Sequence, residues 1–197
     1  LGARRDRLIR HRAWPMACPD GRAVRIAAGG AAGGRVAAAA LARPHDGILG
    51  YVPGVAGMHD VDDYPGARQV PGLVVYRYDA PLCFANAEDF RRRALAAATS
   101  APSALRWFLL NAEANVEVDS TAADALAALH AELKRRGVVF AMARVKQDLR
   151  DQLARAGLID AIGEDRIFMT LPTAVAAYRN WHQQRFGLLP DDSITGA

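Results

Sequence analysis

The chain has 197 residues, 51% hydrophobic and 23% charged, a composition typical of one globular domain with an appendage. Its formal net charge of +4 comes from residues 1–46, which hold nine arginines and three aspartates, because acidic side chains outnumber basic ones in residues 47–197. Without a Lys/Arg stripe interleaved with aromatic residues, this distribution argues against a nucleic-acid-binding surface. Cys18 and Cys83 stand in neither CxxC nor Cys/His spacing, which excludes a disulfide framework and a zinc site built on them.

Residues 1–42 are rich in Arg, Ala and Gly and show no period of 2 or 3.6, so we expect this segment to be disordered. The Ala/Gly-rich stretch 26–41 contains Arg35 and is shorter than the roughly 20 apolar residues of a membrane span. The Arg-rich opening has no Leu-, Ile- or Val-rich core behind it, and we expect no signal peptide. The start on Leu1 and this composition suggest the hypothesis of a gene fragment or a frame-shifted product.

Residues 43–71 are predicted to hold a short strand, Ile48–Val52, followed by Gly and Pro residues and an acidic turn with His59, Asp60, Asp62 and Asp63. Three carboxylates and a histidine could form a metal cluster. Aspartate in a Pro/Gly-rich connection is more typical of turn chemistry, and no histidine completes a ligand spacing on one element, so we expect no metal and no cofactor.

Leu73–Tyr78 is predicted to be a central strand, because apolar residues occupy both of its faces. Pro81 interrupts it, and residues 82–84 are expected to resume it. Asn86 and Asp89 have capping-box-like spacing and predict a helix over 87–98. The inward side chains of this helix are Phe90, Ala94 and Leu95, and the arginines 91–93 are expected to form a solvated face.

Residues 105–137 combine a buried strand, Leu105–Leu110, with a polar turn and an Ala- and Leu-rich helix. Asp119 is expected to cap that helix, with Ser120 and Thr121 in its first turn. The free N–H groups and the helix dipole would accept an anion there, such as a phosphate on Ser120. The predicted inward stripe is Ala122, Leu126, Leu129 and Leu133. Gly137 is expected to end the helix, and His130 is interpreted as a partly buried bystander.

The remaining elements continue the alternation of strand and helix. They are an apolar strand at Val138–Ala143, a helix at Lys146–Ala156 closed by Gly157, and an edge strand at Ile167–Met169. Thr170 and Pro172 predict the start of a last helix with Val175, Tyr178 and Trp181 or His182 inward, and residues 186–197 are expected to be a loose tail. The alternation predicts an α/β domain whose mixed, mainly parallel sheet has about four or five strands, with about four helices.

The order and spacing of these motifs over about residues 43–182 resemble STAS domains. These are the module shared by bacterial anti-sigma-factor antagonists and the cytoplasmic tails of sulfate permease (SulP) anion transporters. The residues that carry the resemblance are Arg43-Pro44-His45-Asp46, Leu49-Gly50, Asn86-Ala87-Glu88-Asp89-Phe90, Asp119-Ser120-Thr121-Ala122, Val138-Val139-Phe140-Ala141, Val145-Lys146, Leu153, Gly157-Leu158, Ile162-Gly163 and Ile167-Phe168 to Ala174.

The resemblance implies a STAS domain over residues 43–185 and a candidate phosphorylation site at Ser120, with Thr121 next to it. The antagonists usually have Gly at the next position. This chain has Ala122 there, and Ala is common at that position in the transporter tails. The alternative for Ser120 is a helix cap worth about 0.5 to 2 kcal/mol.

Two functions follow from the resemblance as expectations. The first is a cytoplasmic regulatory domain detached from a SulP-type transporter, which binds that transporter's membrane domain or another cytoplasmic protein. The second is a free-standing phospho-switch that binds a kinase-type anti-sigma factor. An enzyme is not expected, because Ser120 lies in no GxSxG context and the sequence has no GxxxxGK[ST] loop.

Overall fold

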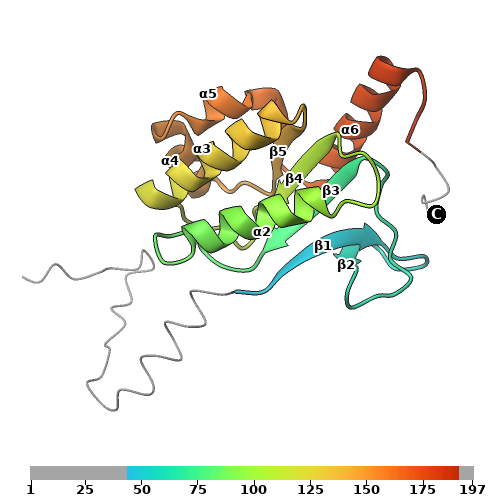
Figure 1. Ribbon diagram of the computed structural model, residues 1–197, viewed down its shortest axis with the longest axis horizontal. Helices are drawn as coiled ribbons and strands as arrows, with labels where there is room; N and C mark the ends of the chain where they lie inside the picture. The colour runs from blue at the N-terminus through green and yellow to red at the C-terminus, as the bar shows by residue number, and fades with distance from the viewer. Residues whose placement is uncertain (1–43, 191–197) are drawn as a thin grey trace, which may run out of the picture. The chain divides into compact units, whose positions relative to one another are not determined.

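The computed structural model describes residues 44–190, which form a six-stranded sheet with helices on both faces (Figure 1). The sheet has the order β2-β1-β3-β4-β5-β6. Its strands are β1 (Asp46–Tyr51), β2 (Met58–Asp60), β3 (Leu73–Tyr78), β4 (Trp107–Asn111), β5 (Val139–Ala143) and β6 (Ile167–Phe168). β3 to β6 run parallel, and β1 is antiparallel to both of its neighbours. β3 therefore lies inside the sheet, as predicted.

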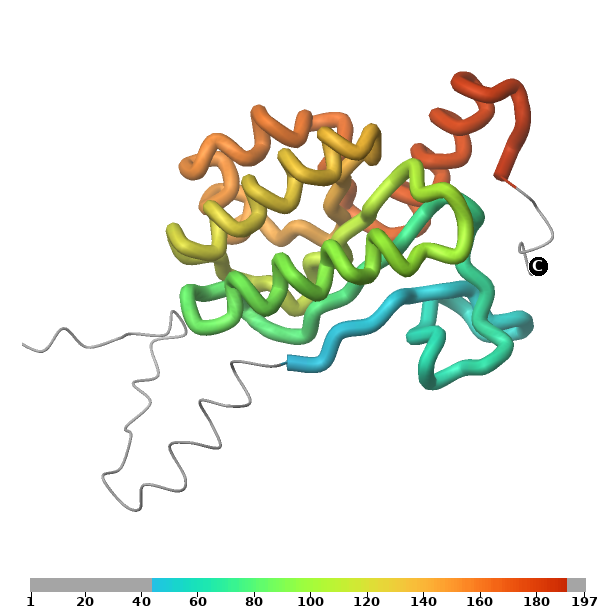
Figure 2. Tube along the Cα trace, in the orientation of Figure 1, coloured from blue at the N-terminus to red at the C-terminus, as the bar shows by residue number. Residues whose placement is uncertain are grey.

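Five α-helices and one short 3-10 helix lie within the described residues. The α-helices are α2 (Ala87–Thr99), α3 (Ser120–Arg135), α4 (Gln147–Arg155), α5 (Leu158–Ile162) and α6 (Leu171–Phe186), and the 3-10 helix is η1 (Glu164–Arg166). Helices α2 to α5 cover one face of the sheet and α6 packs on the other (Figures 1 and 2). The predicted fold class, a mixed and mainly parallel sheet with helices, is confirmed.

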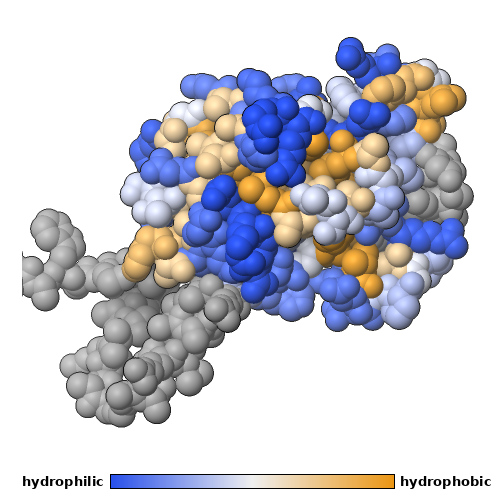
Figure 3. Space-filling view, in the orientation of Figure 1, coloured by the Kyte–Doolittle hydropathy of each residue, from blue (hydrophilic) through white to orange (hydrophobic). Residues whose placement is uncertain are grey.

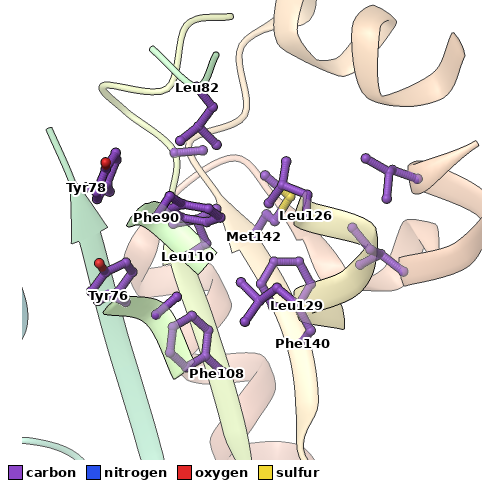
Figure 4. Packing of buried hydrophobic residues seen from close by; sticks show 14 of the residues in the cluster. Tyr76, Tyr78, Leu82, Phe90, Phe108, Leu110, Leu126, Leu129, Phe140 and Met142 are labelled. Carbon is purple, nitrogen blue, oxygen red and sulfur yellow. The ribbon is translucent and has the colours of Figure 1, made fainter. Parts of the chain in front are cut away.

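The larger core lies between the sheet and helices α2 to α5. Because successive strand residues point to opposite faces, β3 turns Val74, Tyr76 and Tyr78 toward these helices. The predicted α3 stripe of Ala122, Leu126, Leu129 and Leu133 is at most 1% exposed and meets them. Figure 4 shows Phe90 of α2 and Leu126 and Leu129 of α3 gathered over the aromatic residues of the strands.

The second core lies beneath α6. Trp107 of β4 packs against Tyr178, with ring centroids 5.7 Å apart, and the Tyr178 hydroxyl donates a hydrogen bond to Pro71 O at 2.6 Å. Val175 and Tyr178 are buried, as the predicted stripe of this helix requires. Thr170 caps α6 in a capping box with Thr173. Together these contacts fix α6 against the strands and set where its first turn meets the sheet.

The structure differs from expectation where local motifs compete. Residues 82–84 do not resume a strand, although Leu82 forms an isolated bridge with Val118. Asn86 holds the N-cap position of α2, but its side chain makes no capping bond, so the predicted capping box is wrong. Its amide instead accepts from Cys83 N and donates to Pro81 O, both at 2.9 Å. The turn at Pro81 brings these backbone groups within reach of the amide, which bonds to them and not to the first turn of α2.

The three adjacent arginines of α2 have two different surroundings. Arg91 and Arg92 pair with Glu88 and Asp89 one turn earlier, and hydrophilic residues stand over α2 in Figure 3. Arg93 reaches Asp46 of β1, and its side chain is 28% exposed. The solvated face predicted for all three arginines is therefore wrong for Arg93, which joins α2 to the sheet.

The last differences between the predicted and the observed elements concern the ends of the chain and two short elements. Residues 1–42, predicted to be disordered, lie outside the described residues, as do residues 191–197 of the predicted loose tail 186–197. Of the rest of that tail, Phe186 is the last residue of α6 and Gly187 is its C-cap. β2 and α5 have no counterpart among the predicted elements, since each has at most five residues and too few positions for a period to show. Gly137, predicted to end α3, has a φ of 73°, and the Val138 N–H returns to Leu133 O at 2.9 Å.

Candidate functional site

The candidate site is the start of α3, which a loop over residues 112–119 connects to the carboxyl end of β4. Asn115 anchors this loop in the protein interior. Its side chain is fully buried and donates to Tyr78 O at 3.0 Å and to Ala80 O at 2.7 Å. Buried backbone carbonyls need such donors, so the amide holds the loop against the end of β3. Asn115 lies in the polar turn predicted between the buried strand and the helix, and this anchoring role was not predicted.

Asp119 caps α3 as predicted, and it also ties the helix to the loop before α2. Its Oδ1 accepts a hydrogen bond from Ala122 N at 2.8 Å, and its Oδ2 accepts one from Phe84 N at 2.7 Å. The N-cap position belongs to Asp119, so the alternative in which Ser120 is itself the cap is wrong. Ser120 is the first residue of the helix.

Ser120 and Thr121 are exposed, whereas Ala122 is 1% exposed and faces the core. The hydrogen bonds from later residues into this end begin with Ala123 N, which donates to Asp119 O at 2.8 Å. The N–H groups of Ser120 and Thr121 therefore precede the first helical hydrogen bond, while that of Ala122 donates to Asp119 Oδ1, and the positive end of the dipole favours an anion here. The Asp119 carboxylate places a negative charge beside the same position and opposes a second one.

Two exposed apolar side chains flank this helix start. Phe84 is 61% exposed and Val116 is 40% exposed. Their loops run side by side, because Leu82 N donates to Glu117 O at 2.9 Å and Asp119 N donates to Leu82 O at 3.2 Å. Figure 2 shows the segment before α2 beside the beginning of α3. We call Phe84, Val116, Ser120 and Thr121 the helix-start surface.

The other candidates from the sequence lie elsewhere. Asp60 is buried against Arg77 and accepts from Asp62 N at 3.1 Å, which agrees with turn chemistry. Within residues 44–190, no group of three or more His, Cys, Asp or Glu side chains is arranged to hold a metal ion. His130 is half-buried beside Phe140, and burial, followed by the charge of Lys134, lowers its pKa.

None of the helices in this part of the chain is both long and apolar enough to span a membrane.

Residues 64–174 match the family model of the STAS domain. Over 139 residues, which are 71% of this chain and 25% of the relative, the chain is 71% identical to a probable sulfate transporter of Mycobacterium tuberculosis. It is similar in structure to a sulfate transporter family protein from Wolinella succinogenes, with a TM-score of 0.50 and 25% identity over 61% of this chain and 96% of that one. It also shares the fold of part of the murine Slc26a9 anion transporter, with a TM-score of 0.67 and 21% identity over 74% of this chain and 24% of that one.

The mixed sheet, its two helical layers and the Asp-Ser-Thr helix start define an α/β domain of the STAS type. The chain belongs to the STAS domain family, and its domain is of the kind found in SulP sulfate transporters. It spans about a quarter of the length of the two probable sulfate transporters of Mycobacterium tuberculosis that it matches.

Proposed function

We propose that residues 43–185 are a cytoplasmic regulatory or interaction domain of a SulP-type sulfate transporter, with no transport activity of their own. The observation that carries this proposal is the 71% identity over 139 residues to part of a protein named as a probable sulfate transporter. The partner is then the membrane-embedded domain of such a transporter or another cytoplasmic protein. The domain acts by binding rather than by catalysis, and it requires neither a metal nor an organic cofactor.

Ser120 is the proposed point of regulation, with Thr121 as the neighbouring hydroxyl. It is exposed at the start of α3, where a phosphate meets the positive end of the dipole and the N–H groups that the Asp119 cap leaves unbonded. These attractions outweigh the repulsion from one solvent-screened carboxylate, Asp119. A negative charge at Ser120 therefore leaves the fold nearly intact and changes the helix-start surface that a partner contacts.

Sulfate uptake by a chimeric transporter tests this proposal. Residues 43–185 replace the matching segment of the Mycobacterium tuberculosis transporter, which is expressed in bacteria that lack their own sulfate uptake. We expect the chimera to take up sulfate and Ser120→Asp to change the uptake rate at equal membrane expression. Ala127→Asp is the matched control, because it adds the same charge to the same helix two turns further on, at another exposed position.

Two results would contradict the proposal. Uptake unaffected by deleting the whole segment would remove the regulatory role. Identical uptake for wild type, Ser120→Ala and Ser120→Asp would leave the domain in place but remove Ser120 as its point of regulation.

The alternative function is a free-standing phospho-switch that binds a kinase-type anti-sigma factor. It is favoured by the exposed Phe84 and Val116 next to Ser120, since an apolar patch beside a phosphorylatable hydroxyl suits a partner surface sensitive to charge. Reading the DNA upstream of codon 43 in all frames separates the two functions. Several encoded apolar spans favour the transporter, and their absence favours the switch.

A further inference from the structure

A row of polar side chains crosses the α6 face of the sheet at the carboxyl ends of the parallel strands. Arg77 of β3 is paired in register with Asn111 of β4, which in turn is paired with Ala143 of β5. Two residues earlier on the same strands lie apolar core residues, namely Val75, Leu109 and Ala141. The last row on this face therefore holds two polar residues, Arg77 and Asn111, beside the apolar Ala143.

Asp60 of β2 joins this row by reaching across β1. The residue of β1 opposite Arg77 is Gly47, and a Cβ added there would lie 1.9 Å from Asp60 Oδ2. Through this opening Asp60 Oδ2 comes to 3.2 Å from Arg77 Nη2, with the Asp60 side chain 2% exposed. Burying charged groups costs free energy even when they are paired. A purely structural sheet would gain more from apolar residues in this row.

A cavity of about 310 Å³ lies over the row. Its polar walls include Arg77, Asn111, Glu113 and Arg144. Its apolar walls come from the β1–β2 hairpin and the start of α6, through Leu49, Tyr51, Met58, Leu171 and Pro172. Ligand pockets in proteins commonly occupy about 300 to 1,000 Å³, and α/β folds bind ligands at the carboxyl ends of their strands.

Asn111 is one of the polar residues that line this cavity. The residue is 2% exposed, and its Oδ1 has no hydrogen-bond partner among residues 44–190. Buried polar atoms in native proteins are nearly always satisfied, and each exception needs an explanation. A ligand hydroxyl or N–H group entering the cavity would satisfy this oxygen.

Arg144 supplies a positive charge at the rim of the cavity. It directly follows β5 with a φ of 59°, which residues other than glycine rarely adopt, and its N–H is fixed by Phe168 O at 3.0 Å. Its guanidinium pairs with Glu113, whose side chain is 57% exposed. A pair this exposed contributes little to stability, so an incoming carboxylate can take the place of Glu113 at small cost.

We propose that this cavity binds a small organic carboxylate that carries a hydroxyl or N–H group. Its carboxylate pairs with Arg144, its donor group bonds to Asn111, and its apolar body lies against Tyr51, Met58 and Leu171. An inorganic oxoanion would leave the apolar walls uncovered. The site lies on the sheet face opposite α3, so binding here is a function separate from any regulation through Ser120.

Calorimetric titration of the full 197-residue chain tests the chemistry of the ligand. The probes are 4-hydroxybenzoate and indole-3-acetate, compared with benzoate, 4-hydroxybenzamide and sodium sulfate. We expect saturable binding of at least one of the first two, weakened roughly tenfold when either its donor or its charge is removed, as for the loss of one charge-assisted hydrogen bond. Failure of both carboxylates to saturate, or equally tight binding of sulfate or of the neutral amide, would overturn the proposal.

Substitutions in two matched ion pairs locate the site. Arg144→Gln should weaken the bound probe roughly tenfold, and Glu113→Gln should strengthen it several-fold because it frees the guanidinium and removes a competing charge. Arg150 and Glu164 form the control pair, with side chains 34% and 64% exposed against 40% and 57% for Arg144 and Glu113. Arg150→Gln and Glu164→Gln should leave the affinity unchanged. Equal effects from the two pairs, or weaker binding by Glu113→Gln, would refute the assignment.

Discussion

Gly47→Ala tests whether the missing side chain at Gly47 is what allows Asp60 to pair with Arg77. Glycine inside a strand ordinarily weakens it, and replacement by Ala would gain roughly 0.5 to 1 kcal/mol if space allowed. Here the new methyl group would lie 1.9 Å from Asp60 Oδ2 and 2.7 Å from Asp60 Cγ. The carboxylate must therefore leave its position, and the substitution acts through the ion pair rather than through the glycine.

The cost follows from the burial of the two partners. Breaking a fully buried pair destabilises a protein by about 3 to 5 kcal/mol. Asp60 meets that condition, but Arg77 is 29% exposed and keeps Asp79 at 3.1 Å. We therefore expect Gly47→Ala to lower the free energy of unfolding by about 2 to 4 kcal/mol, and Asp60→Ala to cost a similar amount.

Urea unfolding of the single and double variants measures these costs. Once Asp60 is an alanine the clash is gone, so Gly47→Ala should add no further loss in the double variant. Gly66→Ala is the control, since a Cβ there meets nothing within 4 Å, and its effect should stay within about 0.5 kcal/mol. Additive losses from Gly47→Ala and Asp60→Ala would show that the glycine matters for a reason unrelated to the ion pair.

Three further predictions concern α3. Leu129→Ala should lower the free energy of unfolding by about 2 to 5 kcal/mol in a urea melt, and a loss below about 1 kcal/mol would mean that its packing is misassigned. Asp119→Ala should cost about 0.5 to 2 kcal/mol and Ser120→Ala less than about 0.5 kcal/mol, an order that reverses if Ser120 is the effective cap. Because the pKa of His130 is lower folded than unfolded, its stabilisation is present above its unfolded pKa and is lost as pH falls below it. His130→Gln should therefore flatten the fall in unfolding free energy between about pH 7.5 and 5.5, and an unchanged slope would contradict this.

Local sequence patterns are sufficient to predict much of the fold. The stripe of α3 and the limits of β3 follow from spacings of three to four and of two residues, and both are found as predicted. Asp119 begins α3 because its side chain accepts a hydrogen bond from the first turn. Gly137 follows the end of α3 because glycine adopts a positive φ without a steric penalty. Such features depend on neighbours within a few residues, so one stretch of sequence is enough to predict them.

The polar interior depended on residues far apart in the chain. Arg77 of β3 pairs with Asp60 of β2, and Arg93 of α2 pairs with Asp46 of β1. Asn111 lies beside Arg77 because the register of β3 and β4 aligns them. Taken alone, Asp60 predicts turn chemistry, Arg93 predicts a solvated helix face, and Asn111 marks only the end of an apolar strand. Their pairing is decided only when the strands align and remove water, because burial is what makes an unpaired charge or amide costly enough to select its partner.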